Sequence, residues 1–172
     1  IENNAKLKLG ESIVVLGSGG IGLNIIQAAN LVSAYPIIAV DLYDERLKLA
    51  KKFGATHIIN SSKSDFVKEI RSIVNSNLDV FVDNTGLPEI IEQGYELINK
   101  AGRLILVGVP KKGKNINIFS LPLHFGKTIT GSFGGECNPE KDIPRYLNLM
   151  TKGKWSIEGL VTERYALKDI NL

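Results

Sequence analysis

A glycine-rich hexapeptide, Gly17-Ser18-Gly19-Gly20-Ile21-Gly22, carries the strongest chemical signal in this sequence. It follows a short apolar run that is typical of a buried strand and precedes a stretch with helical spacing of its apolar residues. The first turn of a helix has unpaired N–H groups, which bind phosphate well. In such a turn Gly17 permits the sharp bend, Gly19 lets the backbone approach a pyrophosphate, and Gly22 lets the helix pack close to the sheet. The spacing therefore predicts a dinucleotide site.

An acidic residue at the end of the next apolar run, Asp41, strengthens this prediction. A carboxylate about 20 positions beyond such a glycine turn accepts hydrogen bonds from the hydroxyls of the adenosine ribose, and its charge repels a 2'-phosphate. Asp41 therefore favours NAD over NADP. Arg46 argues the other way, because an arginine near this position can accommodate the 2'-phosphate. The alternative interpretation of Asp41 is a turn or helix cap, since Asp44 and Glu45 follow closely.

Short apolar runs alternate with amphipathic stretches along the whole chain, which is the pattern of βαβ units. The sequence predicts an α/β fold of the Rossmann type, a doubly wound parallel sheet of six strands in the order 3-2-1-4-5-6 with helices on both faces. The strands are expected over 12–16, 36–40, 57–60, 78–83, 102–109 and 128–133. The helices are expected directly after the glycine turn, over 44–53 and 65–74, after Pro88, and over 139–152.

Composition restricts the remaining possibilities. A chain of 172 residues with 44% hydrophobic and 23% charged residues fits one globular domain, 1–172. Its net charge of +3 is spread along the chain, which argues against nucleic acid or a membrane surface as a partner. Lys111, Lys112 and Lys114 are expected in a solvated loop. A single cysteine, the absence of a long apolar run and the lack of a signal pattern point to the cytoplasm.

No set of residues resembles a catalytic or metal centre. Cys137, His57 and His124 are too scattered to form a metal site, and we interpret each as a packing or surface residue. We therefore name no catalytic residue and no metal ligand in this sequence.

Several segments together resemble the cofactor domain of the zinc-containing alcohol and polyol dehydrogenases, in the medium-chain dehydrogenase/reductase family. The resemblance covers nearly the whole chain and implies hydride transfer between an alcohol carbon and NAD. In that family the zinc and its ligands belong to a separate catalytic domain. We therefore expect this sequence to be a fragment that is inactive alone. The segments are the glycine hexapeptide, Val40-Asp41, residues 50–56, residues 102–110 and residues 131–135.

The resemblance also implies which residues bind the cofactor. Besides the hexapeptide and Asp41, Leu42 would flank the adenine and Arg46 would lie near the adenosine ribose. It also implies a homodimer formed through the edge of the sixth strand, near Thr128 to Gly131. Toward the nicotinamide, Asn84 and Thr85 would lie beside the ribose and the ring, and backbone groups of Val107, Val109, Ser132 and Phe133 would hold the ribose and carboxamide.

Three alternatives remain open at this point. Zinc-free quinone or enoyl reductases share the fold but usually prefer NADP and lack an acidic residue at the position of Asp41. A non-catalytic NAD-sensing domain would have the same motif, and zinc ligands elsewhere in the parent gene would discriminate. A methyltransferase that binds S-adenosylmethionine is disfavoured, because Gly22 completes the dinucleotide spacing and the second nucleotide-binding half is complete.

Overall fold

The computed structural model describes residues 1–75 and 77–171. These residues form two compact units that divide between Asn138 and Pro139, and each is described by itself. The domain expected over 1–172 also includes Ser76 and Leu172, which lie outside the described residues.

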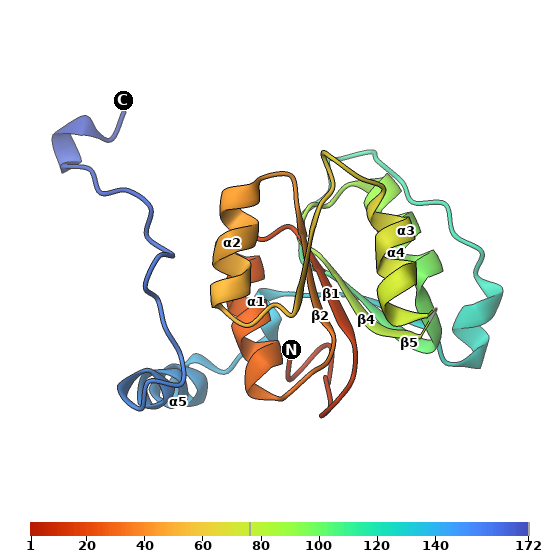
Figure 1. The fold of residues 1–172 in the computed structure, drawn as a ribbon, viewed down its shortest axis with the longest axis horizontal. Helices are drawn as coiled ribbons and strands as arrows, with labels where there is room; N and C mark the ends of the chain where they lie inside the picture. The colour runs from red at the N-terminus through yellow and green to blue at the C-terminus, as the bar shows by residue number, and fades with distance from the viewer. Residues whose placement is uncertain (76, 172) are drawn as a thin grey trace. The chain divides into compact units, whose positions relative to one another are not determined.

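The first unit is a six-stranded parallel sheet in the order β3-β2-β1-β4-β5-β6 (Figure 1). This order confirms the predicted Rossmann-type fold, with the crossover between β3 and β4 that creates two nucleotide-binding halves. The strands are β1 (Ile13–Leu16), β2 (Ile37–Asp41), β3 (His57–Asn60), β4 (Leu78–Asp83), β5 (Ile98–Leu106) and β6 (Thr128–Gly131). The helices of this unit are α1 (Gly20–Leu31), α2 (Asp44–Lys52), α3 (Phe66–Val74) and α4 (Pro88–Leu97), with short 3₁₀ segments η1 (Leu121–Phe125) and η2 (Gly134–Glu136).

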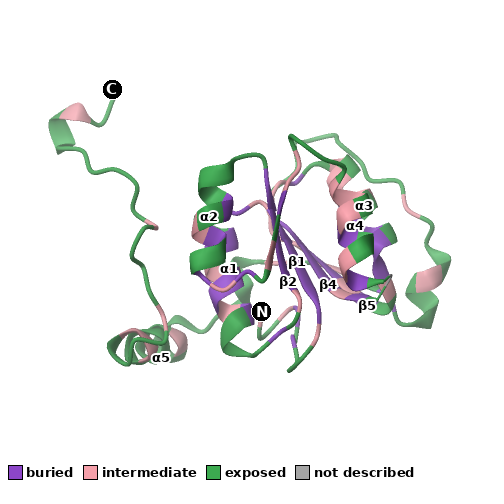
Figure 2. Cartoon of the chain, in the orientation of Figure 1, coloured by how far each residue is buried: buried purple, intermediate pink, exposed green. Residues whose placement is uncertain are grey.

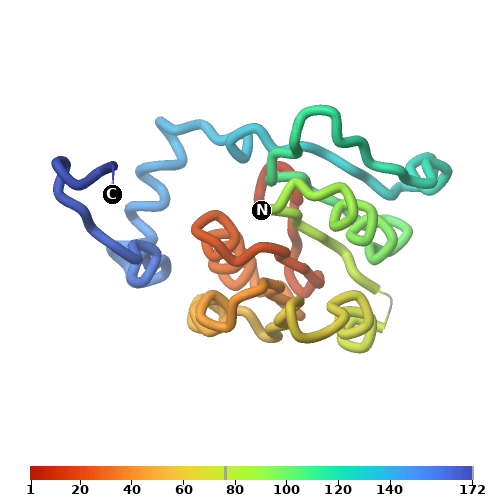
Figure 3. Tube along the Cα trace, turned by 90° about the horizontal axis from the view of Figure 1, so that it is seen from above, coloured from red at the N-terminus to blue at the C-terminus, as the bar shows by residue number. Residues whose placement is uncertain are grey.

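The helices cover both faces of the sheet, as predicted. Helices α1 and α2 lie on one side and α3 and α4 on the other (Figures 1 and 3). Local signals place their ends: the Asp65 side chain accepts hydrogen bonds from Val67 N and Lys68 N at the start of α3. Asn75 ends the same helix in the left-handed conformation.

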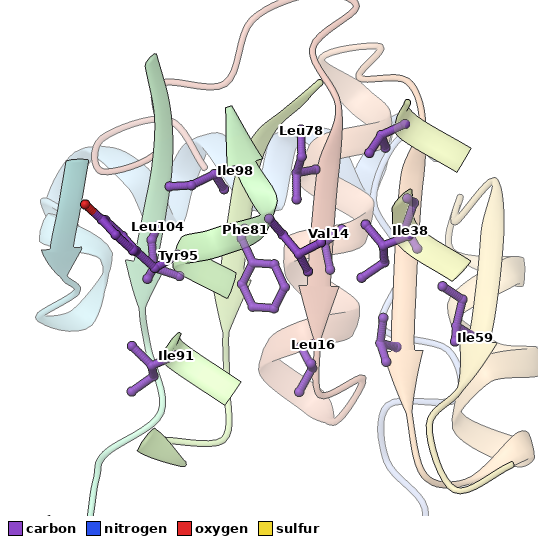
Figure 4. Packing of buried hydrophobic residues seen from close by; sticks show 14 residues of the cluster. Val14, Leu16, Ile38, Ile59, Leu78, Phe81, Ile91, Tyr95, Ile98 and Leu104 are labelled. Carbon is purple, nitrogen blue, oxygen red and sulfur yellow. The ribbon is translucent and has the colours of Figure 1, made fainter. Parts of the chain in front are cut away.

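The core lies between the sheet and these helices. Buried residues are concentrated in the strands and on the sheet-facing sides of the helices (Figure 2). Every residue of β1 and β2 is buried, because a central parallel strand is covered on both faces. On the α3–α4 side, a methyl group at Gly94 would lie 2.7 Å from the Phe81 ring, so glycine lets α4 approach β4 closely. Figure 4 shows this cluster, which includes Val14, Leu16, Ile38, Ile59, Leu78, Phe81, Ile91, Tyr95, Ile98 and Leu104.

Two strands, β5 and β6, differ from the predicted bounds by more than one residue. Strand β5 begins at Ile98 rather than at residue 102 and ends at Leu106 rather than at 109. It ends early because Val107 N and Gly108 N both donate to Asp83 O, at 2.8 and 2.9 Å, so the chain turns out of the ladder there. Strand β6 ends at Gly131 rather than at residue 133.

The second unit contains α5 (Pro139–Thr151) and η3 (Leu167–Asp169). Helix α5 agrees with the helix predicted over 139–152, and it includes Pro144 near its first turn. Arg145 Nη2 lies 3.0 Å from Asp142 Oδ1, an ion pair one turn apart. Over residues 1–75 and 77–171, no helix has both the length and the apolar composition that crossing a membrane requires.

Candidate functional site

One row of residues at the carboxyl edge of the sheet brings together part of the predicted site. Leu16 is in register with Val40 on one side and with Asp83 on the other, and Asp83 in turn pairs with Leu106. Leu106 pairs with Gly131. Because parallel strands end on the same side, the residues that follow this line meet there. They are Gly17, Asp41, Asn84, Val107 and Ser132, all predicted from the sequence as cofactor-binding.

The glycine turn has the conformation and the close contacts that its spacing predicts. Gly17 has φ +92°, in the left-handed region that favours glycine. A methyl group at Gly22 would lie 2.0 Å from Gly17 O, so only glycine lets α1 pack against the turn. At Gly19 and Gly20 the same methyl group would meet nothing within 4 Å. The turn is thus closed toward the sheet and open toward solvent.

The start of α1 is suited to a negative ligand. Gly19 is its N-terminal cap and has no side chain to bond the first N–H groups, and the first turn contains no acidic residue. These N–H groups therefore face the open side of the turn with the positive end of the helix dipole.

Asp41 is buried and lies against this turn. Its Oδ2 accepts a hydrogen bond from Ser18 N at 2.8 Å, and its Oδ1 accepts one from Tyr43 N at 3.1 Å. The carboxylate therefore fixes both the glycine turn and the chain leaving β2. Arg46 Nη1 lies 3.7 Å from Asp41 Oδ2, and its guanidinium carbon lies 4.9 Å from the centre of the Tyr43 ring.

A hollow of about 360 Å³ opens between the turn and the end of β2. Among the predicted residues, Ser18 is buried beneath the turn rather than on the lining. The sequence analysis missed three further residues that line the hollow, Leu16, Tyr43 and Ser61. No motif singles them out, because none of them belongs to the glycine pattern. The predicted residues that line it are Gly17, Gly19, Gly20, Ile21, Gly22, Asp41, Leu42, Arg46, Asn84 and Thr85.

The residues expected near the nicotinamide are less closely gathered. Val107 and Ser132 line a second hollow of about 430 Å³, which shares Ile21 with the first. Val109 and Phe133 line neither hollow and are 89% and 93% exposed. The two N–H groups of Val107 and Ser132 donate within the sheet, to Asp83 O and Leu106 O, both at 2.8 Å.

A buried carboxylate that the sequence analysis treated only as a strand end, Asp83, shapes the turn after β4. Its Oδ1 accepts from Thr85 N at 2.9 Å and from Thr85 Oγ1 at 2.6 Å, and its Oδ2 accepts from Gly86 N at 2.9 Å. These bonds satisfy the carboxylate in place of a cation. The signal was available, because aspartate after an apolar run and before Thr-Gly is typical of a side-chain-capped turn.

A separate polar network lies at the start of α2. Asp44 accepts hydrogen bonds from Lys63 Nζ and, at 2.6 Å, from Asn60 Nδ2. The bond from Lys63, followed by that from Asn60, lowers the pKa of the Asp44 carboxyl. Lys63 therefore forms its ion pair with Asp44, whereas Arg46 lies beside Asp41.

Metal-ligating side chains do not come together in the part of the chain that the structure describes. No group of three or more His, Cys, Asp or Glu side chains there is arranged to hold a metal ion. Cys137 is exposed, and the Nδ1 atom of His57 is within 2.9 Å of Thr56 Oγ1. The described residues therefore do not fit a zinc ion.

Comparison with known proteins places this fold in a family. The family model described as "Zinc-binding dehydrogenase" matches residues 20–152. S-(hydroxymethyl)glutathione dehydrogenase of Paracoccus denitrificans is 32% identical over 98% of this chain and 47% of its own length. The chain thus spans about half the length of such curated relatives.

Solved structures agree. Benzyl alcohol dehydrogenase of Acinetobacter calcoaceticus is 36% identical, with a TM-score of 0.90 over 99% of this chain and 49% of its own. A zinc-binding dehydrogenase of Sinorhizobium meliloti, solved with NADP bound, is 28% identical, with a TM-score of 0.78 over 88% of this chain and 44% of its own. The chain therefore belongs to the zinc-binding dehydrogenase family, and it is the cofactor-binding domain of the family's medium-chain alcohol dehydrogenases.

Proposed function

We propose that this chain binds NAD(H) as the cofactor domain of a zinc-dependent alcohol or polyol dehydrogenase. The observation that carries the proposal is the Asp41 carboxylate, which is buried against the glycine turn and lines the first hollow. Relatives named as alcohol dehydrogenases support the reaction class. Bound NAD supplies the chemistry, since its nicotinamide ring accepts or donates a hydride.

The chain's own residues bind and orient the cofactor. The N–H groups at the start of α1 receive the pyrophosphate over Gly19 and Gly20, where the turn is open. Asp41 accepts hydrogen bonds from the adenosine ribose, and the exposed Leu42 side chain contacts the adenine. Thr85, Val107 and Ser132 lie toward the nicotinamide end, and Val109 and Phe133 expose apolar surface there.

The choice of NAD over NADP depends on the balance between Asp41 and Arg46. A 2'-phosphate would enter beside a buried carboxylate that already accepts two backbone hydrogen bonds and cannot easily turn away. Arg46 is half exposed, so solvent partly screens its charge. Its attraction for a 2'-phosphate therefore only weakly offsets the repulsion from Asp41. The relative from Sinorhizobium meliloti, which binds NADP, makes this a question to be measured for each member of the family.

Calorimetric titration with NADH and NADPH, separately, tests the proposal. The 172-residue chain should bind NADH more tightly than NADPH. In Asp41→Asn the affinity for NADH should fall about ten- to hundredfold, the effect of one charged hydrogen bond, and the preference against NADPH should disappear. Glu45→Gln removes an equal charge from the exposed start of α2 and should change neither affinity.

Two outcomes would contradict the proposal. Tighter binding of NADPH by the unmodified chain would show that Arg46 outweighs Asp41 and would favour a zinc-free quinone or enoyl reductase. Binding of neither nucleotide would remove the cofactor function from these residues. We expect no alcohol oxidation by this chain alone, because its described residues offer no ligand set for the zinc of that reaction.

We also propose a homodimer formed through β6. This strand is at the edge of the sheet, and its residues Thr128–Gly131 are partly or fully exposed. An edge strand has unpaired N–H and C=O groups that pair readily with a second copy. Light scattering should give twice the monomer mass, and a strictly monomeric chain at high concentration would refute this assembly.

A further inference from the structure

The side chain of Asn84 connects the two central strands at the site. Asn84 is the first residue after β4, and its backbone N donates to Leu16 O at 3.0 Å, at the end of β1. Its side-chain Nδ2 then donates to Leu16 O at 3.2 Å and to Gly17 O at 3.1 Å. One amide group therefore holds two successive carbonyls of the chain that enters the glycine turn.

The Gly17 carbonyl is a sensitive point of that turn. Its oxygen lies under the first turn of α1, at the place that excludes any side chain from Gly22. The N–H of the same peptide group, that of Ser18, donates to Asp41 Oδ2 at 2.8 Å. Asn84 and Asp41 thus hold the C=O and the N–H of the single peptide group between Gly17 and Ser18. This fixes the plane of that peptide and the direction of the N–H groups that follow.

The amide of Asn84 can work in one orientation only. Its Oδ1 is buried and has no hydrogen-bond partner among the described residues, whereas Nδ2 faces two carbonyl oxygens. Exchanging the two atoms would bring three acceptors together. A carboxylate at this position would do the same and add a buried negative charge close to the place where phosphate is expected.

We propose that Asn84 is a positioning residue for the phosphate-binding turn, residues 17–22, and that its neutral amide is required there. The inference rests on the proposed function, in that the turn receives the NAD pyrophosphate. It adds a specific chemical requirement to the role expected from the family resemblance, in which Asn84 lies beside the ribose and nicotinamide.

Asn84→Asp tests the requirement for a neutral donor. At about pH 8 the affinity for NAD should fall by about tenfold or more relative to the unmodified chain. At about pH 5 the gap should narrow, because burial beside two carbonyl oxygens raises the pKa of the introduced carboxyl and its protonated form can donate to one of them. Asn84→Ser, which keeps a single donor, should lose affinity by a few-fold with no such pH dependence.

Asn99 provides a matched control at the opposite edge of the sheet. Its Nδ2 donates to Asn77 Oδ1 at 3.2 Å and to Asp79 Oδ1 at 2.9 Å. Asn99→Asp therefore also places a carboxylate beside oxygen atoms that need a hydrogen-bond donor. This variant should lower the melting temperature and leave the affinity for NAD unchanged. An equal loss of affinity in both variants would show a general effect of stability and would overturn the proposal.

Amide hydrogen exchange without cofactor separates this proposal from the function on which it rests. Peptides covering residues 17–22 should exchange faster in Asn84→Asp than in the unmodified chain or in Asn99→Asp. Unchanged exchange there would overturn the role of Asn84 whether or not NAD binds. If the unmodified chain binds no NAD while exchange in the turn does accelerate, the positioning role stands and the proposed function fails.

Discussion

The two edges of the parallel sheet use polar side chains for different purposes. At the amino edge, Ser12 Oγ lies 2.8 Å from Asp79 Oδ2 and accepts from Asp79 N at 2.9 Å, and Arg103 forms an ion pair with Glu11. At the carboxyl edge, Asp41 and Asn84 hold the backbone of a turn whose outer side is open. These polar side chains therefore bind mainly one another at the amino edge, whereas Asp41 and Asn84 bind the backbone of the glycine turn at the carboxyl edge.

Buried polar atoms without a hydrogen-bond partner lie mostly at the carboxyl edge, with one exception at the amino edge. Ser18 Oγ and Asn84 Oδ1 are buried without a hydrogen-bond partner among residues 1–75 and 77–171, and both belong to the carboxyl edge. Arg103 Nε is the corresponding atom at the amino edge. Two of these three buried atoms lie beside the glycine turn, so the described residues leave more polar groups unsatisfied at the carboxyl edge than at the amino edge. Substitutions should accordingly affect binding at one edge and stability at the other.

The largest effect is expected from Gly22→Ala. The added methyl group would lie 2.0 Å from Gly17 O, so α1 or the turn must shift, and NAD binding should become undetectable by calorimetry with a lower melting temperature. Gly19→Ala is the control within the same turn, because its methyl group meets nothing within 4 Å. It should fold normally and lose affinity only because the methyl group enters the space of the phosphates. Normal binding by Gly22→Ala would contradict the packing argument.

The difference between these glycines also shows how far the sequence alone leads. The strand order and the row Gly17, Asp41 and Asn84 follow from apolar periodicity and from the parallel arrangement, which brings strand ends together. The capping role of Asp83 and the contact between Arg46 and Tyr43 depend on side-chain rotamers, which periodicity does not determine. The predicted end of β5 is wrong because Asp83 O accepts hydrogen bonds from two N–H groups that follow the strand. This is a tertiary contact that a local sequence pattern does not contain.

A smaller effect, confined to stability, is expected from Ser12→Ala. The variant leaves the partly buried Asp79 N–H without its acceptor and should lower the free energy of unfolding by about 1–3 kcal/mol. The affinity of the folded fraction for NAD should not change, because Ser12 lies at the amino edge. Urea unfolding and calorimetry on the same preparation measure both quantities. A loss of affinity without loss of stability would contradict the division between the two edges.

Lys127→Met should lower the free energy of unfolding by about 1 kcal/mol at neutral pH. The variant loses the hydrogen bond that Lys127 Nζ donates to Tyr95 O, near the end of α4, at 2.7 Å. Burial lowers the pKa of Lys127, so the unfolded chain binds this proton more tightly than the folded chain. The contribution of Lys127 should therefore become more favourable as pH rises from neutral toward the ordinary lysine pKa of 10.5. Lys100 is exposed and lines a pocket beside η1 together with Lys127, so Lys100→Met is the control and should show no such change. Parallel stability–pH curves for the unmodified chain and Lys127→Met would refute this.

The smallest effect is expected from Tyr43→Leu, at the carboxyl edge. The Tyr43 ring lies 4.9 Å from the Arg46 guanidinium carbon and helps to keep that cation beside Asp41. Its loss should weaken NADH binding by about two- to fivefold, the effect of one partly exposed cation–π contact of about 0.5–1 kcal/mol. Tyr35→Leu makes the same substitution just before β2, at the amino edge, and should leave the affinity unchanged. Equal affinities for Tyr43→Leu and the unmodified chain would show that Asp41 alone fixes Arg46, and the aromatic ring would then have no part in the adenosine site.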